Sequence, residues 1–176
     1  MATHFTGPIL FAGKDGNRKW FENLPIDKNP DYVVYMDDFT GVALDNTNDW
    51  TVVKDSSATA ALGADAESGT LVLTSQATTD NDGASVQGNE IFALSTSRDV
   101  WFETKLKVGD SEGSAIDLCV GLTVNFATNP EAMLTAADRI VFQVDDGDTN
   151  IDCVTEKDGT ATTTDSGVDI ADDTYV

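Results

Sequence analysis

The sequence predicts an all-β protein whose folded domain is an antiparallel β-sandwich or jelly roll. From Tyr32 onward, short apolar runs alternate with turn signals made of Gly, Asp, Asn and Ser. The longest of these runs have a period of two, which is typical of half-buried antiparallel strands. Many strands with a turn signal roughly every ten residues, and almost no helical pattern, favour this fold class.

The first half of the domain contains five expected short strands and one longer strand. The short strands are residues 32–36, 49–54, 70–75, 84–87 and 90–94, separated by polar clusters such as DNDG at 80–83. The longer strand, residues 100–108, has the clearest alternation. One face carries Val100, Phe102, Thr104, Leu106 and Val108, and the other carries Trp101, Glu103, Lys105 and Lys107.

The second half is expected to contain a strand, one or two helical turns and a hairpin. Residues 115–125 form the strand, with an unbroken apolar face from Ile116 to Val124. Residues 129–138 (NPEAMLTAAD) carry the helical pattern. Residues 139–145 and 150–156, joined by DDGDT, form the hairpin. The final DDTYV resembles the start of a further strand, so the natural polypeptide is expected to continue past Val176.

The charge of the chain excludes several classes of partner. Ten basic and 31 acidic residues give a net charge of −21 and a pI near 4.1. Such a surface repels nucleic acid and anionic lipid, so neither is expected as a partner. No apolar run reaches the length of a membrane helix, and the N-terminus lacks the pattern of a signal peptide. We therefore expect the protein to be synthesised in the cytoplasm and to remain soluble there.

Residues 1–31 differ in kind from residues 32–176, and we expect them to form an extended N-terminal arm beside the β-domain. They contain three prolines and four of the ten basic residues, and they show no helical or strand period. The apolar and basic side chains that would contact a partner are Phe5, Ile9, Leu10, Phe11, Lys14, Arg18, Lys19, Trp20 and Phe21. Such an arm packs either on a partner or back across its own domain, and its composition allows both.

No catalytic site is expected. Serine or cysteine nucleophiles need a nearby base, and the only histidine is His4, in the arm. A glycoside hydrolase needs two carboxylates on one strand face, and Glu103 is followed there by Lys105 and Lys107. Cys119 and Cys153 lie in strand-like runs, which predicts packed thiols in place of a disulfide or a zinc site.

The acidic run between the last two predicted strands is a weak calcium candidate. Asp145, Asp146, Asp148 and Asn150 offer oxygen ligands at nearby positions. An EF-hand loop would need glycine and glutamate where this chain has Ile151 and Lys157. A hairpin turn, in which Asp and Gly supply the backbone angles, is the favoured interpretation, so no cofactor is expected.

A set of loose motifs spans most of the chain. They are THFTGPILFAG at 3–13, YMDDFTG at 35–41, NDWTVVKD at 48–55, GTLVLTS at 69–75, NEIFAL at 89–94, RDVWFETKLKV at 98–108, VGL at 120–122 and the final DDTYV. With these motifs the chain resembles phage structural proteins that have a concanavalin-like or laminin-G-like jelly roll. The first motif is similar to N-terminal arms of small virion proteins found beside major capsid proteins.

The resemblance implies a non-enzymatic head decoration or cement protein on the virion surface. Its arm would lie on the major capsid protein or another virion protein, and its jelly roll would face solvent. A homo-oligomer is expected, and a trimer at the three-fold axes of the lattice is one form of it. The alternative is a carbohydrate-binding module on a virion or tail, for which Trp50 and Trp101 would have to be exposed. A glycoside hydrolase is permitted by the fold alone.

Overall fold

The computed structural model describes residues 35–55, 57–64, 69–75, 83–90, 100–109, 116–124 and 129–176. The chain divides into two units, residues 1–37 and residues 38–176. The fold given below is that of the second unit. The predicted arm, residues 1–31, lies outside the described residues.

The regular structure in these ranges is β-strand apart from one turn of 3-10 helix. The strands are β1 (Thr51–Lys54), β2 (Thr59–Leu62), β3 (Leu71–Thr74), β4 (Ala84–Gln87), β5 (Leu118–Thr123), β6 (Arg139–Val144), β7 (Asn150–Lys157) and β8 (Thr160–Asp169), and the helix is η1 (Pro130–Met133). All the pairings between these strands are antiparallel. The prediction of an all-β chain is confirmed. Within the described part, no helix is long and apolar enough to cross a membrane.

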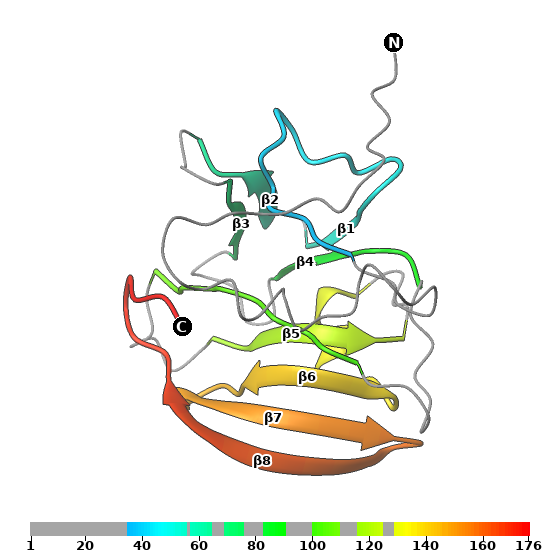
Figure 1. Ribbon diagram of the computed structural model, residues 1–176, viewed down its shortest axis with the longest axis vertical. Coiled ribbons are helices and arrows are strands. Elements are labelled where there is room, and N and C mark those ends of the chain that lie inside the picture. The colour runs from blue at the N-terminus through cyan, green and yellow to red at the C-terminus, as the bar shows by residue number, and fades with distance from the viewer. Residues whose placement is uncertain are drawn as a thin grey trace, which may run out of the picture. The chain divides into compact units, whose positions relative to one another are not determined.

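The strands form three sheets. β1 pairs with β4, β2 pairs with β3, and β5 to β8 form a four-stranded sheet in sequence order. Figure 1 shows these four strands side by side, with β8 at the outer edge. Strands that follow one another in the chain are thus neighbours in this sheet, with short connections from β6 to β7 and from β7 to β8 and a longer one, which contains η1, from β5 to β6. β1, β3 and β4 confirm three of the short strands predicted from the sequence.

Two hairpins build the four-stranded sheet. Residues 145–149 join β6 to β7, as predicted from DDGDT. Asp158 and Gly159 join β7 to β8 with φ angles of 50° and 74°. Two successive positive φ angles make a turn whose twist matches that of the paired strands. The N–H of Asp158 donates to Asp138 Oδ1 at 3.0 Å, and the N–H of Gly159 donates to the Ala137 carbonyl at 3.0 Å, so the turn is anchored.

The register divides the four-stranded sheet into two faces, because directly opposite residues lie on the same face. The apolar face carries Leu118, Val120, Leu122, Ile140, Phe142, Val144 and Cys153. The mixed face carries Cys119, Gly121, Thr123, Arg139, Val141, Gln143, Asp152, Val154 and Glu156.

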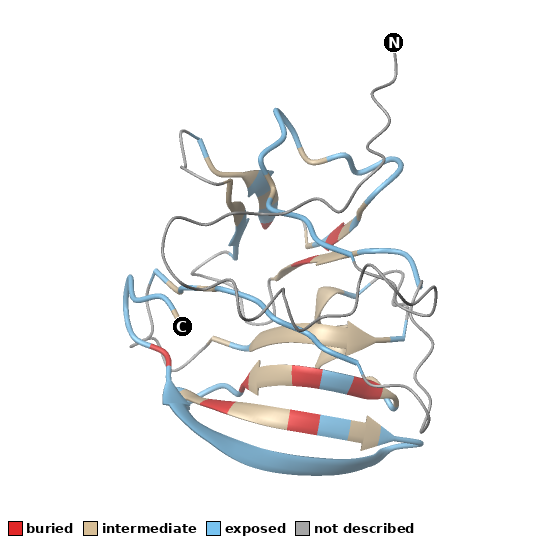
Figure 2. Ribbon diagram, viewed as in Figure 1, coloured by how far each residue is buried: buried red, intermediate tan, exposed pale blue. Residues whose placement is uncertain are grey.

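Both faces contribute to the core. On the apolar face, Val144 packs with Ile151 and Ile170. On the mixed face, Val141 and Val154 are buried. Figure 2 shows bands of buried residues on β6 and β7, whereas all ten residues of β8 are exposed. The buried part of the sheet is therefore its centre, and β8 forms an exposed margin.

The prediction of a strand at residues 100–108 is wrong. Residues 100–107 are not in a strand, and Val100 to Lys105 are exposed. Near its end this segment does find a backbone partner: Leu106 exchanges both backbone hydrogen bonds with Val176, at 3.0 and 3.1 Å. The Val108 carbonyl accepts the N–H of Asp173 at 2.9 Å. A strand needs a continuous ladder, and the alternation of side chains does not supply one.

Other boundaries also differ from the sequence-based expectation. Tyr35 and Met36 are exposed and lie outside any strand, and the rest of the predicted strand 32–36 falls outside the described residues. In the predicted strand 90–94, residues 91–94 also fall outside the described residues, and Glu90 lies in a bend. β5 is shorter than predicted. All six of its residues are half-buried, so its two faces are not distinguished by burial.

The helical turn confirms a further expectation. η1 lies inside the predicted range 129–138, and Asn129 caps it by accepting the N–H of Glu131 at 2.9 Å. Two strands were not predicted at all. They are β2 and the ten-residue β8.

Candidate functional site

The predicted partner-binding residues, Phe5 to Phe21 in the arm, lie outside the described residues, as does His4. In the domain, charged and aromatic side chains gather at five places: the turn between β6 and β7, the mixed face of the sheet, the turn between β7 and β8, the C-terminal segment and the surface near β1.

The weak calcium candidate is organised as a hairpin turn. Asp148 Oδ1 accepts the N–H groups of Thr149 and Asn150 at 2.7 and 3.0 Å. The Asp145 carbonyl accepts the N–H of Asp148 at 3.0 Å, which closes the turn. Asn150 Nδ2 donates to Asp152 Oδ1 at 2.8 Å. Within the described ranges, no three His, Cys, Asp or Glu side chains are placed to hold a metal ion. These contacts support the turn interpretation.

A buried ion pair lies on the mixed face. Arg139 Nε donates to Glu156 Oε2 at 2.8 Å, and the two side chains are 9% and 12% exposed. The register sets this pair, because the two residues are directly opposite on β6 and β7. Charges buried to this extent lose much of their hydration, so each depends on the other for compensation.

The same guanidinium links the sheet to the end of η1. Arg139 Nη1 donates to the carbonyl of Met133 at 3.2 Å, to the carbonyl of Leu134, and to Gln143 Oε1 at 2.9 Å. Nη1 therefore satisfies carbonyl groups that the short helix leaves without internal partners. With its acceptors on the protein itself, Arg139 has a structural role.

The two cysteines lie on opposite faces of the sheet. Cys119 is opposite Gln143 on the mixed face, and Cys153 is opposite Phe142 on the apolar face. Both are half-buried free thiols. Burial raises the pKa of the Cys119 thiol to about 12. The nucleophilic thiolate is therefore scarce at neutral pH.

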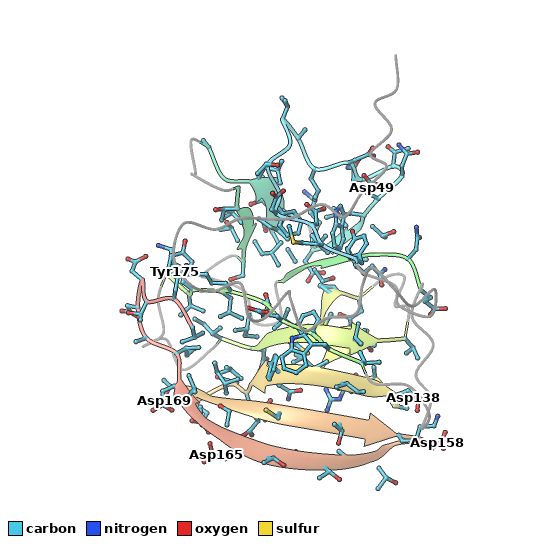
Figure 3. All side chains as sticks on the ribbon, viewed as in Figure 1. Asp49, Asp138, Asp158, Asp165, Asp169 and Tyr175 are labelled. Carbon is cyan, nitrogen blue, oxygen red and sulfur yellow. The ribbon has the colours of Figure 1, made fainter. Side chains whose placement is uncertain are left out.

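Two lysines of the segment 100–108 cluster around a tyrosine of the C-terminal segment. Lys105 Nζ and Lys107 Nζ lie 4.5 and 5.6 Å from the centroid of the Tyr175 ring, which Figure 3 labels. Lys107 Nζ also pairs with Asp173 Oδ1 at 2.9 Å. This hydrogen bond, with the negative charge of Asp173, raises the pKa of Lys107.

A comparable exposed cluster holds the turn between β7 and β8. Lys157 Nζ lies 2.7 Å from Asp138 Oδ1 and 3.2 Å from Asp158 Oδ1. The hydrogen bond from Lys157 lowers the pKa of Asp138 and raises that of Lys157. Figure 3 shows Asp138 and Asp158 close together at this end of the sheet. The cluster fixes the turn between β7 and β8.

The two tryptophans considered as a sugar platform are in different environments. Trp101 is 72% exposed. Trp50 is half-buried, and its ring centroid lies 5.5 Å from that of Phe39. A stacking platform for a sugar ring needs an accessible aromatic face. Trp101 meets this requirement better than Trp50 does.

A shallow depression of about 510 Å³ lies beside β1 and β2. Its lining residues are Val42, Ala43, Leu44, Asn46, Val52, Lys54, Ala60, Ala61 and Leu62. The lining is mostly aliphatic, with one cation and one amide. A binding site of this composition would have few polar groups to fix the orientation of a small ligand.

Comparisons with protein-family models, with curated proteins and with solved structures found no match for this chain. Its function must therefore be argued from its own residues. The feature that sequence reasoning missed is the Arg139–Glu156 pair. Counting outward from the DDGDT turn at residues 145–149 would place residue 139 opposite residue 155, whereas the observed register places Arg139 opposite Glu156, so the turn alone does not give this pair.

Proposed function

We propose that the protein is a non-enzymatic structural component of a phage particle. Residues 1–31 dock on the major capsid protein or another virion protein, so that the chain decorates or cements the capsid. The β-domain is a concanavalin-like jelly roll that faces solvent. The protein is assembled in the host cytoplasm and resides on the virion surface.

The contrast in composition between the arm and the domain carries this proposal. The arm holds four acidic residues (Asp15, Glu22, Asp27 and Asp31), so the domain holds 27 of the 31 (31 − 4 = 27). Basic and acidic residues balance in the arm, four against four, and its apolar side chains are available for packing. A neutral, apolar arm can lie along a protein lattice without the repulsion that the charge of the domain would bring.

The described part of the domain supports a structural role. Two of its charged groups have structural roles: Arg139 pairs with Glu156 across the sheet, and Asp148 accepts two backbone N–H groups of a turn. The Cys119 thiol is kept protonated by burial. Covalent catalysis through a thiol needs the thiolate, which burial makes scarce at Cys119.

The first experiment measures binding of the purified full chain to capsids of its own phage that lack it, by co-sedimentation. The double variant Lys14→Glu/Lys19→Glu reverses two charges in the arm. We expect its binding to be weaker by at least about tenfold, because a repeated lattice multiplies each lost contact.

The matched control is Lys54→Glu/Lys105→Glu, which makes the same change in net charge on two exposed residues of the domain. We expect it to bind as the unchanged chain does. Equal binding by the arm variant and the unchanged chain would contradict docking through the arm. Equal weakening by both pairs of substitutions would show a general effect of charge.

A carbohydrate-binding module is the second candidate, and the exposure of Trp101 favours it. A glycan array probed with the full chain tests this role, with Trp101→Ala as the comparison. Binding of a glycan that is lost in Trp101→Ala would support the module. An array without any bound glycan would remove this candidate.

A further inference from the structure

We propose that β8 is an assembly edge, at which two copies of this chain pair their β8 strands antiparallel about a two-fold axis. The inference goes beyond the proposed capsid role and does not depend on it. It rests on the exposure of β8, on the direction of its backbone groups and on the order of its residues.

β8 is a long strand with one neighbour. It has ten residues, all exposed, and among the described residues it pairs with β7 alone. Edge strands present a row of backbone donors and acceptors, and proteins usually block them with Lys, Pro, a short length or a bulge. The run Thr160–Asp165 (TATTTD) contains neither Lys nor Pro. The shift in register comes after it, between Asp165 and Asp169.

The turn fixes which backbone groups point outward. Lys157 and Thr160 flank the two-residue turn and are directly opposite, so they form a hydrogen-bonded pair. Hydrogen-bonded and non-hydrogen-bonded pairs alternate along an antiparallel ladder. Ala161, Thr163 and Asp165 therefore direct their N–H and C=O groups away from β7. This free edge extends over five residues.

The residue order of this edge suits a second copy of itself. With Thr163 on the two-fold axis, Thr163 faces Thr163 of the second copy, and Ala161 faces Asp165 of that copy. No two carboxylates are then directly opposed, which avoids the cost of facing like charges. A register centred on Asp165 would oppose two carboxylates. The carboxylate of Asp165 thus disfavours that register, whereas the pairing centred on Thr163 is free of facing carboxylates and closes as a dimer.

The charge of the chain predicts how this pairing responds to salt. Two copies that each carry −21 repel one another at long range. Salt screens this repulsion, while backbone hydrogen bonds between strands are affected little. The dimer should therefore become stronger as salt is added. An association driven by opposite charges would become weaker.

Sedimentation velocity of the full chain, over a range of protein and salt concentrations, tests the proposal. We expect a monomer–dimer equilibrium that shifts toward the dimer with salt. Thr163→Pro removes an outward N–H without removing a donor to β7, and an edge strand tolerates it. It should raise the dissociation constant by at least about tenfold, because both copies lose a bond at the axis. Thr162→Ala is the control and should leave the constant nearly unchanged.

A second variant reports on geometry independently of stability. A hydrogen-bonded antiparallel pair has Cα atoms about 5.5 Å apart, within reach of a disulfide. Thr163→Cys should therefore form a covalent dimer under mild oxidation, whereas Val168→Cys, also exposed on β8, should not. A chain that stays monomeric at every salt concentration would overturn the proposal. So would a dimer in which Thr163→Pro has no effect and Thr163→Cys does not cross-link. Either result would leave the binding of capsids through the arm intact.

Discussion

At the scale of single residues, burial decides what the charged and reactive side chains of this domain can do. Arg139 and Glu156 are nearly enclosed and satisfy one another, whereas Lys157 pairs with Asp138 at the surface. The same physical rule acts on Cys119, whose thiol is held neutral by burial. Buried charged groups therefore have a large effect on the free energy of unfolding, in either direction, whereas exposed ion pairs have a small one.

Removing one partner of the buried pair should be costly. Glu156→Leu leaves the Arg139 charge uncompensated, and we expect it to lower the free energy of unfolding by about 3–5 kcal/mol. The double variant Arg139→Met/Glu156→Leu should recover much of this loss, since no buried charge remains. Urea unfolding followed by circular dichroism measures both. Lys157→Ala, which breaks an exposed ion pair, is the control and should change the free energy of unfolding little. If Glu156→Leu had an effect as small as that of Lys157→Ala, the buried ion pair would be contradicted.

The Cys119 thiol should resist alkylation in the folded protein. With a pKa of about 12, only about one thiol in ten thousand is ionised at pH 8, against about one in ten for a pKa of 9.0. Mass spectrometry after brief iodoacetamide treatment, with and without urea, measures the protection. Rapid native modification of Cys119 would refute it.

The raised pKa also has a consequence for stability at high pH. The folded thiol keeps its proton up to about 12, while the unfolded thiol loses it near 9.0. The folded state thus binds more protons between these values, so this group lowers stability as the pH rises through them.

At the scale of elements, close approach of the backbones of β5 and β6 depends on one glycine. Gly121 has φ of 152°, and a Cβ built there would lie 2.3 Å from the Ile140 carbonyl oxygen. Gly121→Ala should therefore destabilise the protein by at least about 2 kcal/mol. Gly109→Ala is the matched control, because nothing lies within 4 Å of its Cβ position. Thermal unfolding measures both, and equal melting temperatures would disprove the close approach.

The elements also show how far the sequence could predict this fold. The β6–β7 hairpin was predictable because DDGDT lies between two apolar runs, and η1 was predictable from Asn129 and Pro130. β8 was missed because its residues are threonines and carboxylates with no apolar period, and its conformation comes from pairing with β7. The segment 100–108 has the alternating pattern of a strand, but residues 100–107 do not form the continuous backbone pairing that a strand needs.

The candidate site was less predictable than the fold. The arm residues were chosen from composition and stay a prediction. The Arg139–Glu156 pair follows from a hairpin register that differs by one residue from the register counted outward from the turn, so it could not be predicted from the turn alone. The cluster of Lys107 with Asp173 joins residues far apart in the chain, and no local pattern announces such a contact.

At the scale of the whole molecule, two features point toward assembly. Several large apolar side chains are exposed in the described part of the domain, including Met36, Val42 and Trp101. The net charge of −21 keeps such a surface in solution by repulsion between copies. A protein of this kind can expose apolar groups for a partner without general aggregation. The proposed arm and the β8 edge are two places where a partner would bind.

Mass spectrometry of purified phage particles tests the central claim most directly. If the chain is a decoration or cement protein, its peptides will be present in the particles at a fixed ratio to the major capsid protein. Particles assembled with the Lys14→Glu/Lys19→Glu variant will contain much less of it. Absence of the unchanged chain from particles of the phage that encodes it would contradict the account.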